Sequence, residues 1–393
     1  MYTENIIAIA KRENNAKRKF LVVNKYQGKH VPVSPDLPLK MFSALADLVA
    51  ERCKGERLLL IGFAETATAI GETLAVQLDT DYMQTTREHI PEAEYLYFSE
   101  SHSHAAEQKV VKNDLDSVIG RIDRIVFVED EVTTGNTIGK IVSLIRQTYD
   151  KELKFSAVSL LNGMDEEALE RYQKEQIDLV YLVKTEHSGY SGIADGCRND
   201  GSYHKVSGLA ADVYLPGAEE VPVSENISAQ GIHKMSQKLL FRPVTASGYI
   251  NARRLHKGRE YQAACEKLWQ EIKERIPFGK GRDILVLGTE EFMYAPLYAA
   301  QKISELGNRV KCHATTRSPI MVSRQQEYPL HERYELVSLY EEERTTYVYD
   351  LDNYDLALIL TDAEPEHPGA VSLISALDSC GCREIYMVRW CGK

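Results

Sequence analysis

The most informative segment of the chain is IVFVEDEVTTGNT, residues 125–137. Four apolar residues predict a buried strand, which begins at residue 124 and ends in two adjacent acids, Glu129 and Asp130. A turn of hydroxyl residues and glycine follows, and the spacing of apolar residues then predicts a helix over 138–149. A buried strand joined to a helix by a short turn is the unit of a doubly wound, mostly parallel α/β sheet.

The turn itself has the composition of a phosphate site. The first amides of a helix have no partner within the helix and carry partial positive charge, so they bind anions. Glycine lets the backbone approach the anion closely, and threonine hydroxyls add donors. The predicted phosphate-binding residues are Thr133, Thr134, Gly135, Asn136 and Thr137.

The two acids cannot face that phosphate without repulsion, so we expect Glu129 and Asp130 to accept hydrogen bonds from sugar hydroxyls. The loop then predicts a sugar phosphate site. The alternative is an ordinary threonine-capped helix that follows a strand.

The rest of the chain repeats the alternation of short apolar runs and amphipathic stretches. A segment rich in Gly, Ser and Asp, residues 186–231, predicts loop and linker. It separates an expected first domain, 1–238, from a second domain, 239–393. The expected strands are 57–62, 81–84, 124–128, 155–161, 177–183, 283–288, 356–360 and 384–388. The expected helices are 68–78, 138–149, 165–175, 259–276, 296–306 and one that begins at 372.

The two halves resemble each other in three places, in the same order. LLLIGFAETATAIGETLA resembles ILVLGTEEFMYAPLYAAQ, QTTRE (84–88) resembles ATTRS (314–318), and the strand before Asp130 resembles the strand before Asp362. This order indicates an internal duplication in which the second domain is a degenerate relative of the first. The alternative is that all doubly wound folds share this succession of strand, loop and helix.

Composition excludes several classes of protein. The 393 residues carry 47 Lys and Arg against 58 Asp and Glu, a net charge of −11, whereas proteins that bind nucleic acid usually have a basic excess. No apolar run approaches the roughly 18 residues of a membrane helix, and we expect no secretory signal. The seven cysteines include no CxxC pair, which predicts reduced thiols in a cytoplasmic protein.

The segment IVFVEDEVTTGNT resembles the phosphoribosyl diphosphate signature of the type I phosphoribosyltransferases. It departs from that signature only at Glu131, where the family usually has an apolar residue. The resemblance implies an enzyme that moves ribose 5-phosphate from phosphoribosyl diphosphate to a nitrogenous, base-like acceptor. It also implies Mg²⁺, with Asp130 and Glu129 as the protein side chains nearest the metal.

The same resemblance assigns roles to three further segments. The loop after the first strand, Ala64, Glu65, Thr66 and Ala67, is expected to bind the diphosphate, although Glu65 is unusual there. Arg87 is expected to pair with diphosphate oxygens; the alternative is a surface ion pair with Glu88. Residues 99–109 correspond to a flexible hood in which Lys109 covers the leaving diphosphate.

In the second half, Thr316-Arg317-Ser318-Pro319 resembles the TRSP domain, which follows a phosphoribosyltransferase domain in proteins associated with bacterial tellurite-resistance gene clusters and nucleoside-like biosynthesis. The residues after Asp362 read AEPEHPG and lack a phosphate cradle, since proline donates no amide and acids repel phosphate. The sequence leaves open whether Arg317 and Ser318 bind a ligand, the other domain, or neither.

Other functions remain open at this level. The chain can be a non-catalytic binder of phosphoribosyl diphosphate or nucleotides, or an enzyme that cleaves nucleotides with diphosphate. The TRSP half can be a docking module. A homodimer is also open, and neither nucleic acid nor a membrane is an expected partner.

Overall fold

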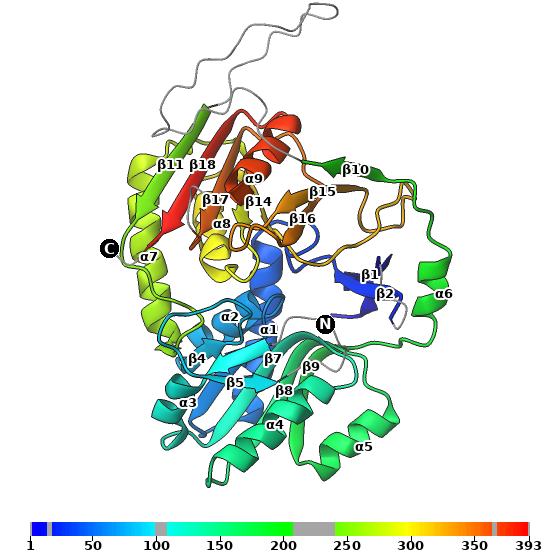
Figure 1. The fold of residues 1–393 in the computed structure, drawn as a ribbon, viewed down its shortest axis with the longest axis vertical. Helices are drawn as coiled ribbons and strands as arrows, with labels where there is room; N and C mark the ends of the chain where they lie inside the picture. Colours follow the sequence, from blue (N-terminus) through cyan, green and yellow to red (C-terminus); the bar gives the residue numbers. More distant parts are fainter. Residues whose placement is uncertain (1, 14–17, 99–107, 207–239, 364–367, 392–393) are drawn as a thin grey trace, which may run out of the picture.

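A computed structural model describes residues 2–13, 18–98, 108–206, 240–363 and 368–391. It contains two larger parallel sheets, one in each half of the chain, which lie one above the other in Figure 1. In the first half the order is β4-β3-β7-β8-β9, with all neighbours parallel. The strands are β3 (Leu58–Gly62), β4 (Asp81–Gln84), β7 (Arg124–Val132), β8 (Lys154–Asn162) and β9 (Ile177–Lys184). The helices are α1 (Asp36–Arg52), α2 (Thr68–Leu78), α3 (Lys112–Ile119), α4 (Asn136–Thr148) and α5 (Glu166–Lys174).

The second half contains a five-stranded sheet of order β11-β18-β17-β13-β14, again with all neighbours parallel. Its strands are β11 (Leu240–Ala246), β13 (Asp283–Gly288), β14 (Arg309–Ala314), β17 (Leu356–Thr361) and β18 (Glu384–Trp390). Its helices are α7 (Gly258–Arg275), α8 (Tyr294–Glu305) and α9 (Pro368–Ser379). The α/β fold with mostly parallel sheets, predicted from the alternation of apolar runs and helices, is confirmed.

Smaller elements complete the described part of the chain. In the first half the antiparallel pair β5–β6 follows β4 along the chain. In the second half the antiparallel pair β15–β16 follows β14. The prediction that residues 186–231 are all loop was wrong for α6 and β10, which are too short and polar to show a period. The smaller elements of the described chain are the 3₁₀ helix Glu4–Ile6, β1 (Ile7–Lys11), β2 (Phe20–Asn24), β5 (Tyr95–Phe98), β6 (Gln108–Val111), α6 (Tyr190–Asp195), β10 (Ser202–Lys205), β12 (His256–Lys257), β15 (Glu332–Val337) and β16 (Thr345–Tyr349).

The strand orders of the halves correspond. The central run β4-β3-β7-β8 of the first sheet matches β14-β13-β17-β18 of the second. The amide of Thr85 donates to the Gly62 carbonyl at 2.9 Å, and the amide of Thr315 donates to the Gly288 carbonyl at 3.0 Å. This shared order and bonding support the internal duplication.

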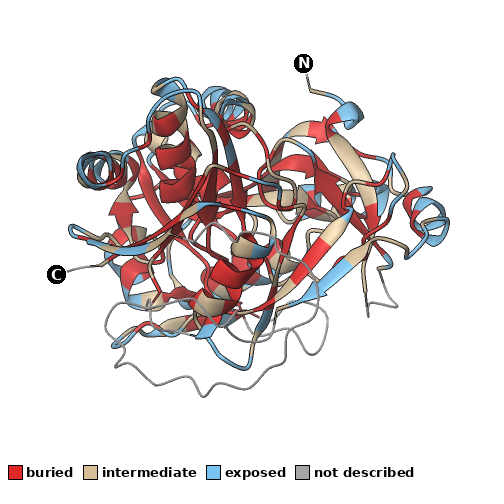
Figure 2. Cartoon of the chain, turned by 90° about the horizontal axis from the view of Figure 1, so that it is seen from above, coloured by how far each residue is buried: buried red, intermediate tan, exposed pale blue. Residues whose placement is uncertain are grey.

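Each half also reaches the edge of the other half's sheet. Val33, just before α1, pairs with Cys312 on β14, while β12, just before α7, pairs antiparallel with β4. One apolar cluster includes buried residues from both sheets, among them Leu60 and Val286, and Figure 2 shows buried segments running through the joined halves. The halves therefore fold around a shared core. The expected boundary at 238/239 lies outside the described residues and stays a prediction.

Candidate functional site

The loop after β7 is shaped by one glycine. Gly135 has a φ of +67° and caps the N-terminus of α4. A Cβ at this position would lie 2.4–2.5 Å from the Tyr172 side chain. The Tyr172 hydroxyl donates to the Gly135 carbonyl at 2.8 Å, and Arg171 donates to the Thr134 carbonyl. Because backbone angle and packing both require glycine, the loop has a single well-defined course.

Helix α4 is fixed beneath this loop by its apolar face. The side chains of Ile138, Ile141, Val142 and Ile145 are buried, as the spacing predicts. A hollow of about 70 Å³ lies at the N-terminal end of the helix. Its lining is Glu129, Glu131, Val132, Thr133, Thr134, Gly135, Asn136, Thr137 and Ile138. The structure therefore brings the predicted phosphate residues and one of the two predicted acids to one place.

The acids alternate along β7, which continues to Val132 instead of ending at residue 128. The Thr66 hydroxyl donates to Asp130 Oδ1 at 2.7 Å, so Asp130 faces the loop after β3. Burial raises the pKa of Asp130, against the effect of that hydrogen bond. Glu129 and Glu131 line the hollow instead. The two predicted sugar-binding acids therefore point to different sides of the strand.

Glu131, the departure from the family signature, is held by the side chains of Arg18 and His187. Arg18 Nη2 lies 2.5 Å from Glu131 Oε2, and His187 Nε2 lies 3.2 Å from Oε1. Burial alone would raise the pKa of Glu131, but His187 and Arg18 hold it below its ordinary value. Sequence reasoning missed both side chains, because they come from segments with no recognisable pattern.

The loop after β3 is held on several sides. The Ala64 amide donates to Thr85 Oγ1 at 2.8 Å, and Gln108 Nε2 donates to the Ala64 carbonyl at 3.1 Å. Gln27 Nε2 donates to the Thr66 carbonyl at 2.7 Å. The Ala67 side chain is fully buried, and the Ala64–Glu65 peptide bond is cis. The loop is thus fixed by its neighbours and reaches Asp130 through Thr66.

The Glu65 carboxylate points into the protein. Lys29, which is fully buried, places Nζ 2.8 Å from Glu65 Oε1, and Arg317 of the second half places Nε 3.5 Å from Oε2. Burial opposes ionisation of Glu65, yet Lys29 and Arg317 lower its pKa to about 2. Glu65 is therefore a buried, charged link between the halves. No local sequence pattern pointed to Lys29.

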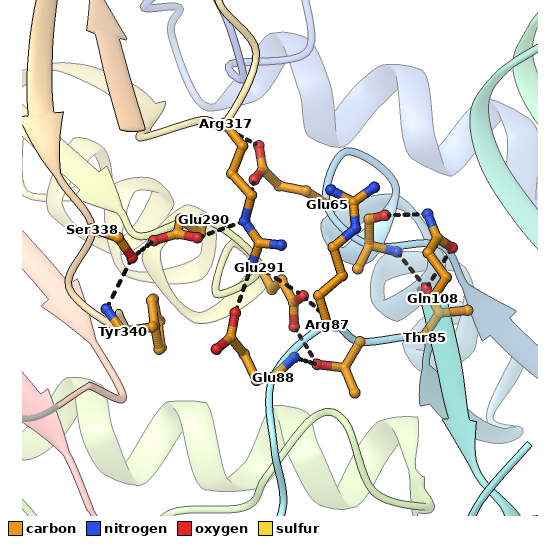
Figure 3. A network of polar contacts seen from close by, with 12 residues as sticks. Glu65, Thr85, Arg87, Glu88, Gln108, Glu290, Glu291, Arg317, Ser338 and Tyr340 are labelled. Carbon is orange, nitrogen blue, oxygen red and sulfur yellow. Dashed lines mark hydrogen bonds and ion pairs between the residues drawn. The ribbon is translucent and has the colours of Figure 1, made fainter. Parts of the chain in front are cut away.

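Arg317 joins both halves in the network of Figure 3. Its guanidinium lies 2.6 Å from Glu290 Oε2 and 2.7 Å from Glu88 Oε1. Arg344 also pairs with Glu88, at 2.7 Å. Burial would lower the pKa of Arg317, but the surrounding carboxylates raise it. The question left open by the sequence is thereby answered for Arg317, which binds the first half.

The remaining predicted residues lie around this network. The Arg87 amide donates to Glu291 Oε1 at 3.0 Å, and Glu88 pairs with Arg317 and Arg344 rather than with Arg87. Lys109 Nζ lies 4.4 Å from the centre of the Tyr95 ring. Residues 99–107, most of the expected hood, lie outside the described residues.

Metal ligands are sparse. Among the residues that the structure describes, no group of three His, Cys, Asp or Glu side chains could hold a metal ion. Asp130 and Glu129 offer oxygens of the kind Mg²⁺ prefers, and Mg²⁺ usually takes one or two carboxylates together with substrate phosphates and water. Such residues fit a metal brought by a phosphorylated substrate.

The described helices also include none long and apolar enough to cross a bilayer.

Family comparison agrees with this geometry. Residues 6–186 match the PRTase_2 family, described as phosphoribosyl transferase, and residues 253–377 match the TRSP domain C-terminal to PRTase_2. The chain carries a PRTase_2 domain followed by a TRSP domain. The hollow at α4 and the loop after β3 belong to the PRTase_2 domain, and Arg317 belongs to the TRSP domain.

The solved structures to which the chain is similar include three adenine phosphoribosyltransferases. Adenine phosphoribosyltransferase from Rhodothermus marinus is 14% identical over 46% of this chain and 96% of its own, with a TM-score of 0.34. The enzyme from Trypanosoma brucei, in complex with AMP, pyrophosphate and ribose-5-phosphate, is 14% identical over 46% and 77%, with a TM-score of 0.34. The enzyme from Thermoanaerobacter pseudethanolicus is 19% identical over 46% and 97%, with a TM-score of 0.33. No curated protein matches the chain.

Proposed function

We propose that the protein transfers ribose 5-phosphate from phosphoribosyl diphosphate to a nitrogenous, base-like acceptor. One observation carries the proposal: a hollow at the N-terminus of α4 is bounded by the threonine-rich loop and by the carboxylate of Glu129. Membership of the PRTase_2 family supports it. A cytoplasmic location and a role in making a nucleoside-like metabolite are part of the same proposal.

In this proposal the helix amides and the hydroxyls of Thr133–Thr137 hold the 5-phosphate. Glu129 accepts hydrogen bonds from the ribose hydroxyls on the side of the hollow, and Asp130 accepts them from the side of the loop after β3. The Thr66–Asp130 hydrogen bond ties the sugar side of the site to the diphosphate loop. Backbone groups of Ala64–Ala67, rather than the inward-facing Glu65 carboxylate, face the diphosphate together with Arg87 and Lys109. Asp130 and Glu129 are the residues that would hold Mg²⁺ brought by the diphosphate, and the metal would supply positive charge for the leaving group.

The bond from C1 to the diphosphate oxygen breaks, a bond from C1 to the acceptor nitrogen forms with inversion, and the nitrogen loses its proton. Charge builds on the leaving diphosphate during this step. The residues of the chain therefore contribute alignment and charge stabilisation and no covalent intermediate.

The test is diphosphate release. The full chain is incubated with phosphoribosyl diphosphate, Mg²⁺ and a panel of nitrogen heterocycles, and diphosphate and the new ribotide are measured. Acceptor-dependent release, lost in Asp130→Asn, is the expected result. Binding of phosphoribosyl diphosphate without release from any acceptor would instead identify the non-catalytic binder, and formation of phosphoribosyl diphosphate from nucleotides would identify the reverse reaction.

A further inference from the structure

A second cavity lies at the interface of the halves, away from the threonine-rich loop. Its volume is about 380 Å³, which is within the range of small-molecule sites. It is bounded by Glu88, His89, Ile90 and Pro91 on the PRTase_2 side and by TRSP-half residues that include Arg253, Tyr340 and Asp362. No residue lines both this cavity and the hollow at α4.

One of the residues that line this cavity is a buried cation with spare donor capacity. Arg253 is 5% exposed. Its Nε lies 3.1 Å from Glu291 Oε2, and its Nη1 lies 2.5 Å from Asp362 Oδ2. Among the described residues, Arg253 Nη2 has no hydrogen-bond partner. A buried, unpartnered N–H is unfavourable, so an acceptor from a ligand would stabilise it.

The corresponding cation of the other half is saturated. Lys29 precedes α1 as Arg253 precedes α7, and it pairs with Glu65 as Arg253 pairs with Glu291. The three donors of Lys29 reach Glu65, the Glu290 carbonyl and the Thr315 carbonyl, at 2.8–2.9 Å. The spare donor is therefore particular to the cavity in the second half.

The side chains that line the cavity indicate which kind of ligand it can bind. Two carboxylates, Glu88 and Asp362, and one guanidinium line it, so a phosphate would meet excess negative charge. The rings of Tyr249 and Tyr340 and the apolar side chains of Ile90 and Pro91 suit a flat, largely apolar surface. A ligand that satisfies these walls is planar and uncharged, with an oxygen for Arg253 and an N–H for Glu88.

We propose that this cavity is a second ligand site and that it binds an uncharged nitrogen heterocycle bearing a carbonyl oxygen, as nucleobases do. Arg253 Nη2 donates to the carbonyl, Glu88 accepts from the ring N–H, and the tyrosines flank the ring. Because the site shares no residue with the hollow at α4, its existence does not depend on phosphoribosyl transfer.

The experiment is a titration of the full chain with hypoxanthine, uracil and adenine, and with ribose 5-phosphate as an anionic probe. Calorimetry gives the affinity, and tryptophan fluorescence gives a local signal, since the Trp390 ring lies 5.4 Å from the Tyr249 ring. Arg253→Lys keeps the positive charge between Glu291 and Asp362 but removes the planar fork. His89→Trp adds bulk at an exposed rim residue and disturbs none of the ion pairs described above.

We expect a carbonyl heterocycle to bind the wild-type chain. Arg253→Lys and His89→Trp should each weaken this binding about tenfold or more. Asp130→Asn, in the other site, should bind the heterocycle as the wild type does. The proposal is overturned if no heterocycle binds below about 1 mM. It is also overturned if Arg253→Lys and His89→Trp bind with unchanged affinity, if Asp130→Asn loses the binding, or if ribose 5-phosphate competes for the cavity.

Discussion

In the PRTase_2 half, β7 leads through Thr133–Thr137 into α4, whereas in the TRSP half β17 ends at Thr361, before Asp362. The two strands occupy the same place in their sheets, next to β3 and β13. The glycine-bearing loop that shapes the hollow at α4 is therefore a property of one half, although both halves share the scaffold. The two halves therefore share a scaffold and differ in the residues that follow the corresponding strand.

The two halves contact each other reciprocally, since residues after β4 bind a glutamate of the second half and residues after β14 bind a glutamate of the first. Thr86 Oγ1 donates to Glu291 at 2.7 Å, and the Arg87 amide donates to the same carboxylate. In return the amide of Arg317 donates to Glu65 Oε1 at 3.4 Å, and Thr316 contributes to the lowered pKa of Glu65. Each Thr-Arg pair thus holds the glutamate of the opposite loop. The TRSP half therefore helps to hold the loop after β3 of the first half in place.

The largest expected effect tests this exchange. Glu65→Gln leaves Lys29 buried without a carboxylate, since Glu65 is the only one within 4.0 Å of Lys29 in the described residues, and should lower the free energy of unfolding by about 3–5 kcal/mol. Glu291→Gln should cost less, about 1–3 kcal/mol, because Arg253 keeps Asp362. Urea denaturation measures both. Equal losses would show that the two glutamates are interchangeable in energy.

The second prediction compares the acids that end β7 and β17. Asp130→Asn should weaken binding of phosphoribosyl diphosphate about 10- to 100-fold, because a charged acceptor for the sugar is lost. Asp362→Asn, at the corresponding position, should change that affinity less than about twofold. Calorimetry with Mg²⁺ present, at a temperature where both variants are folded, separates them. A comparable loss in both would mean that the TRSP half also binds this substrate.

The third prediction concerns the glycine at the N-terminus of α4. Gly135→Ala meets both a φ of +67° and the Tyr172 ring, so it should cost about 2–4 kcal/mol of stability and reduce substrate affinity. Gly55→Ala is the matched control, because its φ is +80° but nothing lies within 4 Å of the added Cβ. It should cost about 1 kcal/mol and leave affinity unchanged. Equal costs in thermal unfolding would remove the role assigned to Tyr172.

Sequence patterns predicted what depends on local order. The period of Ile138, Ile141, Val142 and Ile145 gave α4 and its buried face. Short apolar runs gave most strands of the two sheets, but β11 and β14 in the second half were not predicted. The departure at Glu131 was visible, but its partners Arg18 and His187 were not, because three distant segments meet there. Contacts between the halves, such as Arg317 with Glu65, depend on how two folded units pack and leave no local period.

The smallest expected effect is a pH dependence of the link between the halves. Lys29 and Arg317 lower the pKa of Glu65 to about 2, from an ordinary value near 4.5. The unfolded chain therefore binds the proton more readily, so the stability due to ionised Glu65 is complete above about pH 4.5 and is lost as pH falls toward 2. The difference in unfolding free energy between the wild type and Glu65→Gln should accordingly narrow between pH 5 and pH 3 in urea titrations. Since Glu291 keeps its place in the variant, a difference that stays constant over this range would mean that Glu65 is not the titrating group that joins the two halves.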